Sequence, residues 1–331
     1  MQIDIRTDSV SPIRQTFANI ARRFGDKPAS RYQEAMYDLQ PTTNFHYRPL
    51  WQSEFELYDA RRTRVTMTDW YELKDPRQLY YATYVNNRAR QQEVMERNLE
   101  FAEKRGLIAM LPEEVKRILQ LGVVPLRHIE WAANMNNAYI TGFGFGTAIT
   151  QACMYQTMDR LGIAQYLTRL GLLIGGKQAV ADAKTAWLDD PIWQPLRNAV
   201  EDLLVCQDWF ELFVGQNLIL DGLVYPLVYQ KLDQHLFHHH RIGPAFALVT
   251  EFMSTWHEET TRWVDAVVKT AAAANADNPV VLSEFAYRWL DRFADALKPL
   301  ATLMFGDEGD EVLAAVATPL AARCNKLSLS R

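Results

Sequence analysis

Apolar residues recur at helical spacing along most of the chain from Asp75 onward. Leu282, Phe285 and Trp289, for example, follow one another at spacings of three and four residues and share one helix face. The central and C-terminal parts contain no strand-like alternation and no hairpin signal. Several predicted helices reach roughly 25–30 residues, which favours a helical bundle. The pattern therefore predicts an all-α protein, with helices over residues 75–106, 112 onward, 125–158, 159–187, 191–204, 207–235, 244–270 and 282–297.

Proline, glycine and capping residues set the expected boundaries of these helices. Asp75-Pro76 is a good start, because an aspartate cap precedes a proline in the first turn. Gly106 is expected to end the same helix. Pro226 falls inside the apolar run 207–235 and predicts a kink there. Asn278-Pro279 is expected to lie in a loop before the last predicted helix.

The first 75 residues follow a different pattern. One helix is plausible over 12–24, and the chain after it is expected to be extended and irregular. Its aromatic residues disfavour disorder. We therefore expect an N-terminal arm, residues 1–75, that lies either on the rest of the chain or on a partner. Residues 76–331 would form the helical domain. The arm is broken by four prolines: Pro12, Pro28, Pro41 and Pro49.

A stretch without charge lies between Glu130 and Asp159 and is long enough to span a bilayer. It contains several Asn and Gln residues, and its ends lack the Lys and Arg bias of membrane helices. A helix without charge on any face is also typical of the centre of a large soluble protein. We therefore expect a buried helix and no membrane insertion.

Composition narrows the class of protein further. The chain has 331 residues, 38 aromatics (9 Trp, 14 Tyr and 15 Phe) and a net charge of −5, which argues against nucleic-acid binding. Its three cysteines are far apart in sequence and form no Cys-x-x-Cys pair, so a reducing compartment is expected. Charged residues occupy the N-terminus where a signal peptide needs an apolar run. The expected location is the cytoplasm.

Two glycine-rich stretches only partly match nucleotide-binding motifs. Residues 142–146 carry three glycines, but Thr147 stands where the dinucleotide motif needs the last one, and no strand precedes them. Residues 171–177 fit Gly-x4-Gly-Lys, but Gln178 replaces the Ser or Thr that would hold magnesium. We expect close helix packing at the first stretch and a helix end or tight crossing at the second.

Catalytic side chains are scarce. His235, His238, His239 and His240 lie within six residues, and His235 and His239 are one helical turn apart, a spacing that can bind a metal. No carboxylate or cysteine ligand stands beside them in sequence, so a polar helix end is the preferred interpretation and a weak metal site the alternative. Nucleophilic catalysis has little support, because Cys153 and Cys206 lie in apolar helices that would raise a thiol pKa.

A helical bundle can house a di-iron centre, and the sequence can be searched for the motifs that such a centre needs. Di-iron centres in such bundles use two Glu-x-x-His motifs and two further glutamates. None of the seven histidines has a glutamate three residues before it. We therefore expect no conventional di-iron site in this chain.

The sequence nevertheless resembles a known family in three short stretches. These are Asp-Pro-Arg at 75–77, Tyr-Tyr-Ala-Thr-Tyr-Val at 80–85 and Val-Pro-Leu-Arg-His-Ile-Glu at 124–130. In their order, and with the chain length and helix layout, they resemble the β (small hydroxylase) subunit of bacterial multicomponent monooxygenases, phenol hydroxylase in particular. In that resemblance, Pro125 and His128 correspond to a Glu-x-x-His motif that has lost its glutamate. The stretch 258–262 corresponds to one that has lost its histidine. Glu211 would lie near a former ligand position.

The resemblance implies a ferritin-like fold and a scaffolding role without catalytic, cofactor-binding or metal residues in this chain. The di-iron centre would belong to a large α subunit that, with a small γ subunit, forms an (αβγ)2 hydroxylase. A regulatory protein would dock on it. A reductase with FAD and an iron–sulfur cluster would supply electrons from NADH for the conversion of phenol to catechol.

Two other functions remain open at this point. One is a helical metal-dependent enzyme with an irregular site, built from Glu211, Glu258 or the histidine cluster. The other is a stand-alone helical binding module.

Overall fold

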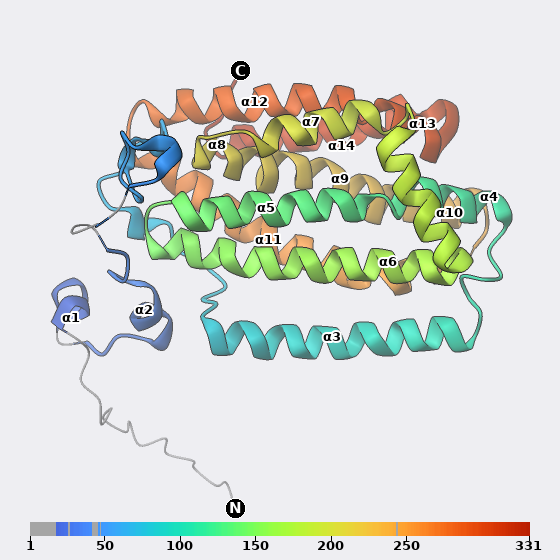
Figure 1. The fold of residues 1–331 in the computed structure, drawn as a ribbon, viewed down its shortest axis with the longest axis horizontal. Helices are drawn as coiled ribbons and strands as arrows, with labels where there is room; N and C mark the ends of the chain where they lie inside the picture. The colour runs from blue at the N-terminus through green and yellow to red at the C-terminus, as the bar shows by residue number, and fades with distance from the viewer. Residues whose placement is uncertain (1–17, 26, 42–45, 47, 243) are drawn as a thin grey trace, which may run out of the picture.

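Helices account for the regular structure of the described chain, as predicted. A computed structural model describes residues 18–25, 27–41, 46, 48–242 and 244–331, and no strand occurs among them. Long helices lie side by side along one axis, with α3 on one outer side and α12 on the opposite side (Figure 1). The α-helices are α1 (Ala18–Phe24), α2 (Arg31–Met36), α3 (Tyr81–Lys104), α4 (Glu113–Ile118), α5 (Leu126–Phe143), α6 (Thr147–Asp189), α7 (Gln194–Leu204), α8 (Trp209–Phe213), α9 (Asp221–Pro226), α10 (Asp233–His239), α11 (Ala245–Ala274), α12 (Asn278–Ala296), α13 (Lys298–Phe305) and α14 (Gly309–Lys326). Short 3-10 turns are η1 (Leu50–Gln52), η2 (Ala60–Arg62), η3 (Trp70–Glu72) and η7 (Gly306–Glu308), and π-helical segments are η4 (Leu119–Val123), η5 (Val214–Leu220) and η6 (Leu227–Leu232).

The helix at the centre of the core runs without a break from Trp209 to His239, through α8, η5, α9, η6 and α10. It is long and apolar enough to cross a membrane by length and composition, but 94% of its most apolar window is buried inside the protein. Pro226 keeps helical dihedral angles (φ −64°, ψ −38°), and π-helical segments lie on both sides of α9. The position of Pro226 in the sequence predicts a kink in the helix. Instead, a change from α-helix to π-helix accommodates the proline.

The prediction of a single helix over residues 125–158 is wrong. Two helices, α5 and α6, are joined by the glycine-rich stretch and pack along each other. Gly146 has φ +93°, and a Cβ atom on Gly144 would lie 2.5 Å from the carbonyl oxygen of Ile140. These glycines therefore make the turn between the helices, where the sequence suggested only close packing.

The boundary predicted between residues 158 and 159 is also wrong, because α6 continues through it to Asp189. Instead, Gly175 (φ −158°) and Gly176 (φ +67°) interrupt the helix. A Cβ atom on Gly171 would lie 3.0 Å from Val180 Cγ2, so the crossing is tight. The helix end or tight crossing expected at residues 171–177 is confirmed. The part of α6 after these glycines turns across the end of the bundle (Figure 1).

The helix α3 begins at Tyr81, and the start predicted at Asp75-Pro76 is wrong. The Asp75 carboxylate accepts hydrogen bonds from the backbone N–H and the guanidinium of Arg77 at 2.9 Å, and Gln78 has φ +50°, which no helix allows. The helix is capped instead by Tyr80, whose N–H donates to Thr83 Oγ1 at 2.9 Å. The predicted end holds, because α3 stops just before Gly106.

The loop predicted at Asn278-Pro279 is wrong as well. Asn278 is the first residue of α12, and Pro279 is accommodated in the first turn, where a helix needs no N–H donor. The buried Asn278 side chain donates to the carbonyl oxygens of Ala271 (2.7 Å) and Thr66 (2.8 Å). It thereby holds the end of α11 and part of the N-terminal arm together.

The described part of the N-terminal arm packs on the chain itself. Its helix α1 covers only the end of the predicted helix 12–24, and residues 12–17 lie outside the described residues. Ile20, Tyr32 and Met36 bury against Tyr71 and Ala148 of α6. The arm is therefore anchored to the bundle through α2.

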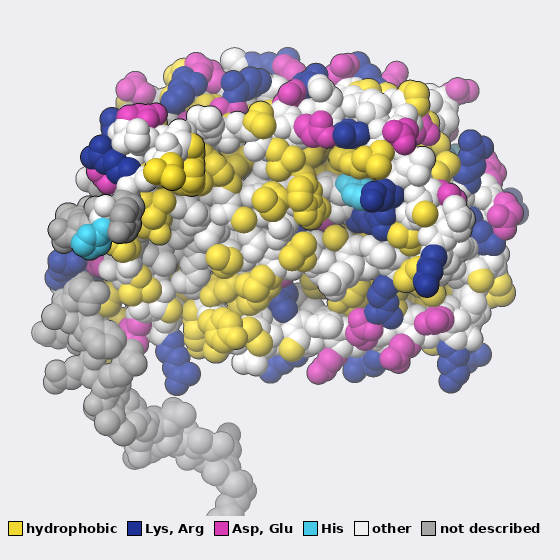
Figure 2. Space-filling view, in the orientation of Figure 1, with side chains coloured by type: hydrophobic (Ala, Val, Ile, Leu, Met, Phe, Trp, Pro, Cys, Tyr) yellow, Lys and Arg dark blue, Asp and Glu magenta, His cyan; other side chains and the backbone are white. Residues whose placement is uncertain are grey.

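Exposed apolar side chains gather on the face that α5 and α6 present in Figure 2. The Asn134 amide of α5 donates to the Thr157 carbonyl of α6 at 2.7 Å, so these parts of the two helices are adjacent. Trp131 is the largest apolar side chain here and is 54% exposed. The outward apolar residues of the two helices include Trp131, Met135, Met154, Met158 and Leu161, which we call the α5–α6 face.

Candidate functional site

A buried arginine lies at the centre of the bundle between two carboxylates. Arg160 of α6 is 1% exposed, and its Nη1 lies 3.1 Å from Glu130 Oε2 of α5. Its Nη2 pairs with the Asp221 carboxylate of α9. Tyr225, one turn further along α9, accepts from Arg160 at 3.2 Å and donates to Glu130 at 2.8 Å. Three helices thus direct charged groups to one point. In other helical bundles, inward-facing side chains from several helices bind a metal ion in this way.

Amide side chains extend this cluster along α5 and η5. Gln216 donates to the second oxygen of Asp221 at 3.0 Å and accepts from Asn136 at 2.9 Å. Asn217 and Asn137 exchange hydrogen bonds of 3.2 and 3.3 Å. Buried polar groups are costly unless they are hydrogen-bonded, and here they bond to one another.

Burial and charge act on this cluster in opposite directions. Burial raises the pKa of Glu130 and of Asp221, and Arg160 offsets only part of that effect. Burial alone would lower the pKa of Arg160, but Asp221 and Glu130 outweigh it, so the guanidinium stays protonated. Arg160 therefore favours the ionised form of both carboxyl groups, which their burial disfavours.

His257 of α11 packs against the cluster. Its ring stacks on Tyr225, with centroids 4.9 Å apart and planes at 17°. Burial, followed by Arg323 and Arg160, lowers its pKa to about 3, so the imidazole is neutral. It packs on the cluster as an aromatic ring and adds no charge to it.

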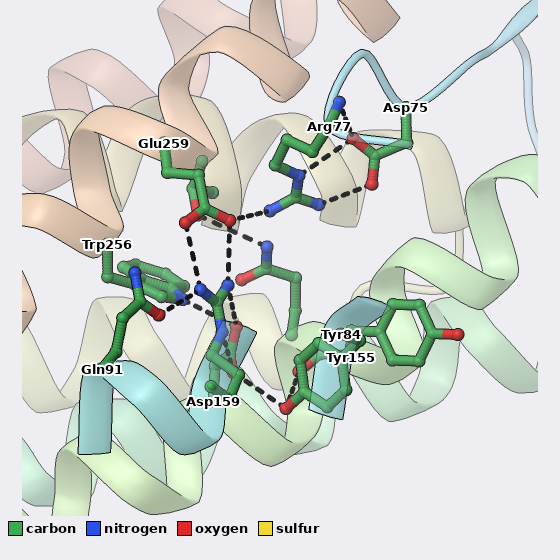
Figure 3. Close-up of polar contacts among 11 residues, drawn as sticks. Asp75, Arg77, Tyr84, Gln91, Tyr155, Asp159, Trp256 and Glu259 are labelled. Carbon is green, nitrogen blue, oxygen red and sulfur yellow. Dashed lines mark hydrogen bonds and ion pairs between the residues drawn. The ribbon is translucent and has the colours of Figure 1, made fainter. Parts of the chain in front are cut away.

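A second network adjoins the first, because Asp159 directly precedes Arg160 in α6. Figure 3 shows the polar contacts around Asp159. The Asp159 carboxylate accepts from Tyr84 Oη at 2.9 Å, from Arg88 Nε and Nη2 at 2.9 Å, and from Trp256 Nε1 at 2.8 Å. Arg88 also donates to both oxygens of Glu259 at 3.0 and 3.1 Å. The arginine of α3 therefore joins a carboxylate of α6 to one of α11.

The network continues into the N-terminal arm. Arg77 lies 3.6 Å from Glu259 and 2.9 Å from Asp75 (Figure 3). The Asp75 backbone N–H donates to Tyr32 Oη of α2 at 2.8 Å. Charge pairs thus connect the arm, α3, α6 and α11, and this placement indicates a structural role.

Replacing Arg88 with methionine is expected to lower the free energy of unfolding by roughly 3 kcal/mol, because Asp159 would keep its buried charge without a cation. Urea unfolding measures the difference. Arg169→Met is the matched control, since the Arg169–Glu96 pair is more than one third exposed and is expected to contribute less than about 1 kcal/mol. Equal losses in the two variants would contradict the assigned role of Arg88.

Of the residues that the sequence offered for an irregular metal site, the two glutamates lie apart from the histidine cluster. Glu211 is buried in α8, where it accepts from Trp289 Nε1 at 2.8 Å and pairs with Arg288. Glu258 is exposed on α11. His128 stacks on Trp187 at 5.6 Å, and burial lowers its pKa to about 4.

Cys153 lies in α6 as predicted, whereas Cys206 lies in the loop between α7 and α8 and not in a helix. Burial raises the pKa of Cys153, and burial with Asp208 raises that of Cys206 to about 11. Both thiols, like that of Cys324, are free.

The histidine cluster gains a carboxylate that the sequence did not indicate. His235 and His239 stack with ring centroids 4.3 Å apart, and His235 Nδ1 lies 3.8 Å from Glu308 Oε2 of η7. His238 is exposed, and His240 Nδ1 lies 3.9 Å from Glu114. Within the described residues, His235, His239 and Glu308 form the one group of three possible metal ligands that lie close together.

The central cluster does not fit a di-iron centre. Such a centre needs about four carboxylates and two histidines facing inward. Here Glu130 and Asp221 are both already bonded to Arg160, and His257 stacks on Tyr225. A guanidinium at the centre would also repel a metal cation.

Sequence reasoning missed these central residues, although two signals point to them. Glu130, Asp159 and Arg160 bound the uncharged stretch, so they lie at the ends of a segment that was itself expected to be buried. Asp221 is the one charged residue between Glu211 and Lys231 in an apolar run. A charge isolated in a buried helix needs a buried partner.

Sequence comparisons relate the chain to known hydroxylase components. The profile of the Methane/Phenol/Alkene Hydroxylase family matches residues 51–275. The chain is 52% identical over 323 residues to the phenol 2-monooxygenase oxygenase component DmpL of Pseudomonas sp. (strain CF600), covering 97% of each chain. It is 26% identical to the hydroxylase component subunit beta of the toluene-4-monooxygenase system of Ectopseudomonas mendocina, covering 69% of this chain and 71% of that one.

A solved structure gives the same result. The chain superposes on a chain of phenol hydroxylase from Pseudomonas sp. OX1 with a TM-score of 0.92, 47% identity and 99% coverage of both chains. The expected ferritin-like helical fold is confirmed by this neighbour. The chain belongs to the methane, phenol and alkene hydroxylase family, as the resemblance of its sequence indicated.

Proposed function

We propose that this chain is the non-catalytic β subunit of a multicomponent aromatic monooxygenase, in which it holds a di-iron α subunit in shape. The proposed reaction converts phenol, O2, NADH and a proton into catechol, water and NAD+. Its relatives are named as phenol 2-monooxygenase oxygenase components and as a hydroxylase subunit beta, which supports both the reaction and the place in the complex.

The observation that carries the proposal is the position of Arg160. The guanidinium binds the two inward carboxylates, Glu130 and Asp221, that a metal would need. It thereby neutralises buried negative charge, as a metal cation would, but it has no redox chemistry and no open coordination position. A helical bundle whose centre is occupied by a guanidinium is suited to a structural role beside the di-iron α subunit.

The α5–α6 face supports a large interface. Exposed apolar patches mark interaction sites when they are contiguous, and this one contains Trp131 and several methionines, residue types that are enriched in interfaces. We assign this face to contact with the α subunit.

The remaining assignments follow from the proposed role. The small γ subunit would complete an (αβγ)2 hydroxylase, a regulatory protein would bind it transiently, and a reductase with FAD and an iron–sulfur cluster would supply electrons. This chain would hold no cofactor. Its three free cysteines and net charge of −5 support a cytoplasmic location and no role in nucleic-acid binding.

Separate and joint expression tests the proposal. The expected partner is a companion chain that carries two Glu-x-x-His motifs, expressed together with the proposed γ subunit. With reductase, regulatory protein, NADH and phenol present, catechol is expected only when both chains are assembled. Turnover by the present chain without the companion would overturn the non-catalytic role.

A further inference from the structure

The end of α10 and the turn η7 bring together two imidazoles and a carboxylate at the surface. His235 and His239 come from successive turns of one helix, and Glu308 comes from a segment about 70 residues further along. The ligand atoms of the three residues lie within 4.8 Å of one another, and His235 Nδ1 is 3.8 Å from Glu308 Oε2. This cluster is separate from the buried arginine site and from the proposed function of the chain.

The surrounding structure holds the ligands in place. The Phe305 ring at the end of α13 meets the His235 ring edge to face, with centroids 5.3 Å apart. Gly306 follows with φ +61°, a backbone conformation that glycine adopts without strain, and this turn places Glu308 beside α10. His239 and Glu308 are exposed, so an ion could reach them from solvent.

The donor set matches one class of ion. Two imidazole nitrogens and one carboxylate oxygen suit Zn²⁺ and its neighbours Ni²⁺ and Cu²⁺, whereas Ca²⁺ and Mg²⁺ prefer oxygen ligands alone. Ligands bound to tetrahedral zinc at about 2.1 Å lie about 3.4 Å apart. The present separations need to close by no more than about 1.4 Å, which rotation of the exposed His239 and Glu308 side chains can supply.

We propose that His235, His239 and Glu308 form a binding site for a divalent transition-metal ion, with a fourth position left to water. A bound ion would link α10 to the turn between α13 and α14. The bound ion would lie apart from the buried arginine cluster, and we assign it a structural role.

Zinc titration of the full-length chain tests this site. Calorimetry with Zn²⁺ alone is expected to show one equivalent bound, with affinity at least about tenfold weaker in His239→Ala and in Glu308→Gln. His238→Ala and Asp307→Asn are matched controls, because both residues are exposed neighbours on the same two elements outside the cluster. The control variants are expected to bind zinc as the natural chain does.

Cobalt gives an independent spectroscopic measurement. Co²⁺ bound with nitrogen and oxygen ligands at four positions is expected to add visible absorption that is lost in His239→Ala and retained in His238→Ala. Zinc binding that is absent, or that is equally strong in the ligand variants and the controls, would overturn the proposal.

Discussion

Replacing Arg160 with methionine is expected to lower the free energy of unfolding by about 3–5 kcal/mol, because Glu130 and Asp221 would be left as buried charges without a cation. The loss should depend on pH. Burial already raises the pKa of both carboxyls above their unfolded values. For such acids the protonated form favours the folded state, so stability is greatest at low pH and is lost as the pH rises. The variant is therefore expected to regain stability on acidification.

Urea unfolding at several pH values measures both effects. The triple variant Glu130→Gln, Arg160→Met, Asp221→Asn removes all three charges together, and it is expected to recover much of the stability that the single variant loses. Arg160→Lys keeps the charge but not the forked geometry, so a smaller loss is expected. A single variant as stable as the natural chain at neutral pH would contradict the assigned role of Arg160.

Introducing charge on the α5–α6 face is expected to weaken assembly with the companion chain strongly. The variant Trp131→Asp, Met158→Asp places two carboxylates where an apolar interface would have to desolvate them, and such burial is costly without partners. Co-purification with the companion chain is expected to fall at least about tenfold, since a loss of ~1.4 kcal/mol already has that effect. The helical circular dichroism of the variant alone should remain unchanged, because both residues are exposed.

Val280→Asp is the control for this variant. Val280 is 63% exposed and belongs to α12, outside the two helices that form the α5–α6 face, so assembly with this substitution is expected to be normal. Retention of the companion chain by the double variant would place the interface elsewhere.

The class of fold could be predicted because helical periodicity is a local property of the sequence. Boundaries that depend on distant residues could not. Arg77 beside Asp75 and Glu259 draws the chain away from a helix at residue 75, and Glu259 lies far along the sequence. The turn at Gly146 likewise packs against Trp70, which no local pattern indicates.

For the candidate site, the sequence showed only that a motif is missing, and none of the residues that form the buried cluster was predicted from it. The lack of any Glu-x-x-His motif pointed away from a conventional di-iron centre before the fold was known. The positive feature, a guanidinium between two carboxylates, requires three helices to be placed in space. The same holds for Glu308, whose approach to the histidine pair depends on the turn at Gly306.

The iron content of this chain is the most direct test of its proposed role. The assembled hydroxylase would be purified, its chains separated without loss of bound metal, and iron per chain determined by mass spectrometry. The same measurement on the His239→Ala variant excludes iron held by the surface cluster. We predict iron in the companion chain and far less than one equivalent in this one. Iron near two equivalents in this chain, retained in the His239→Ala variant, would contradict the account.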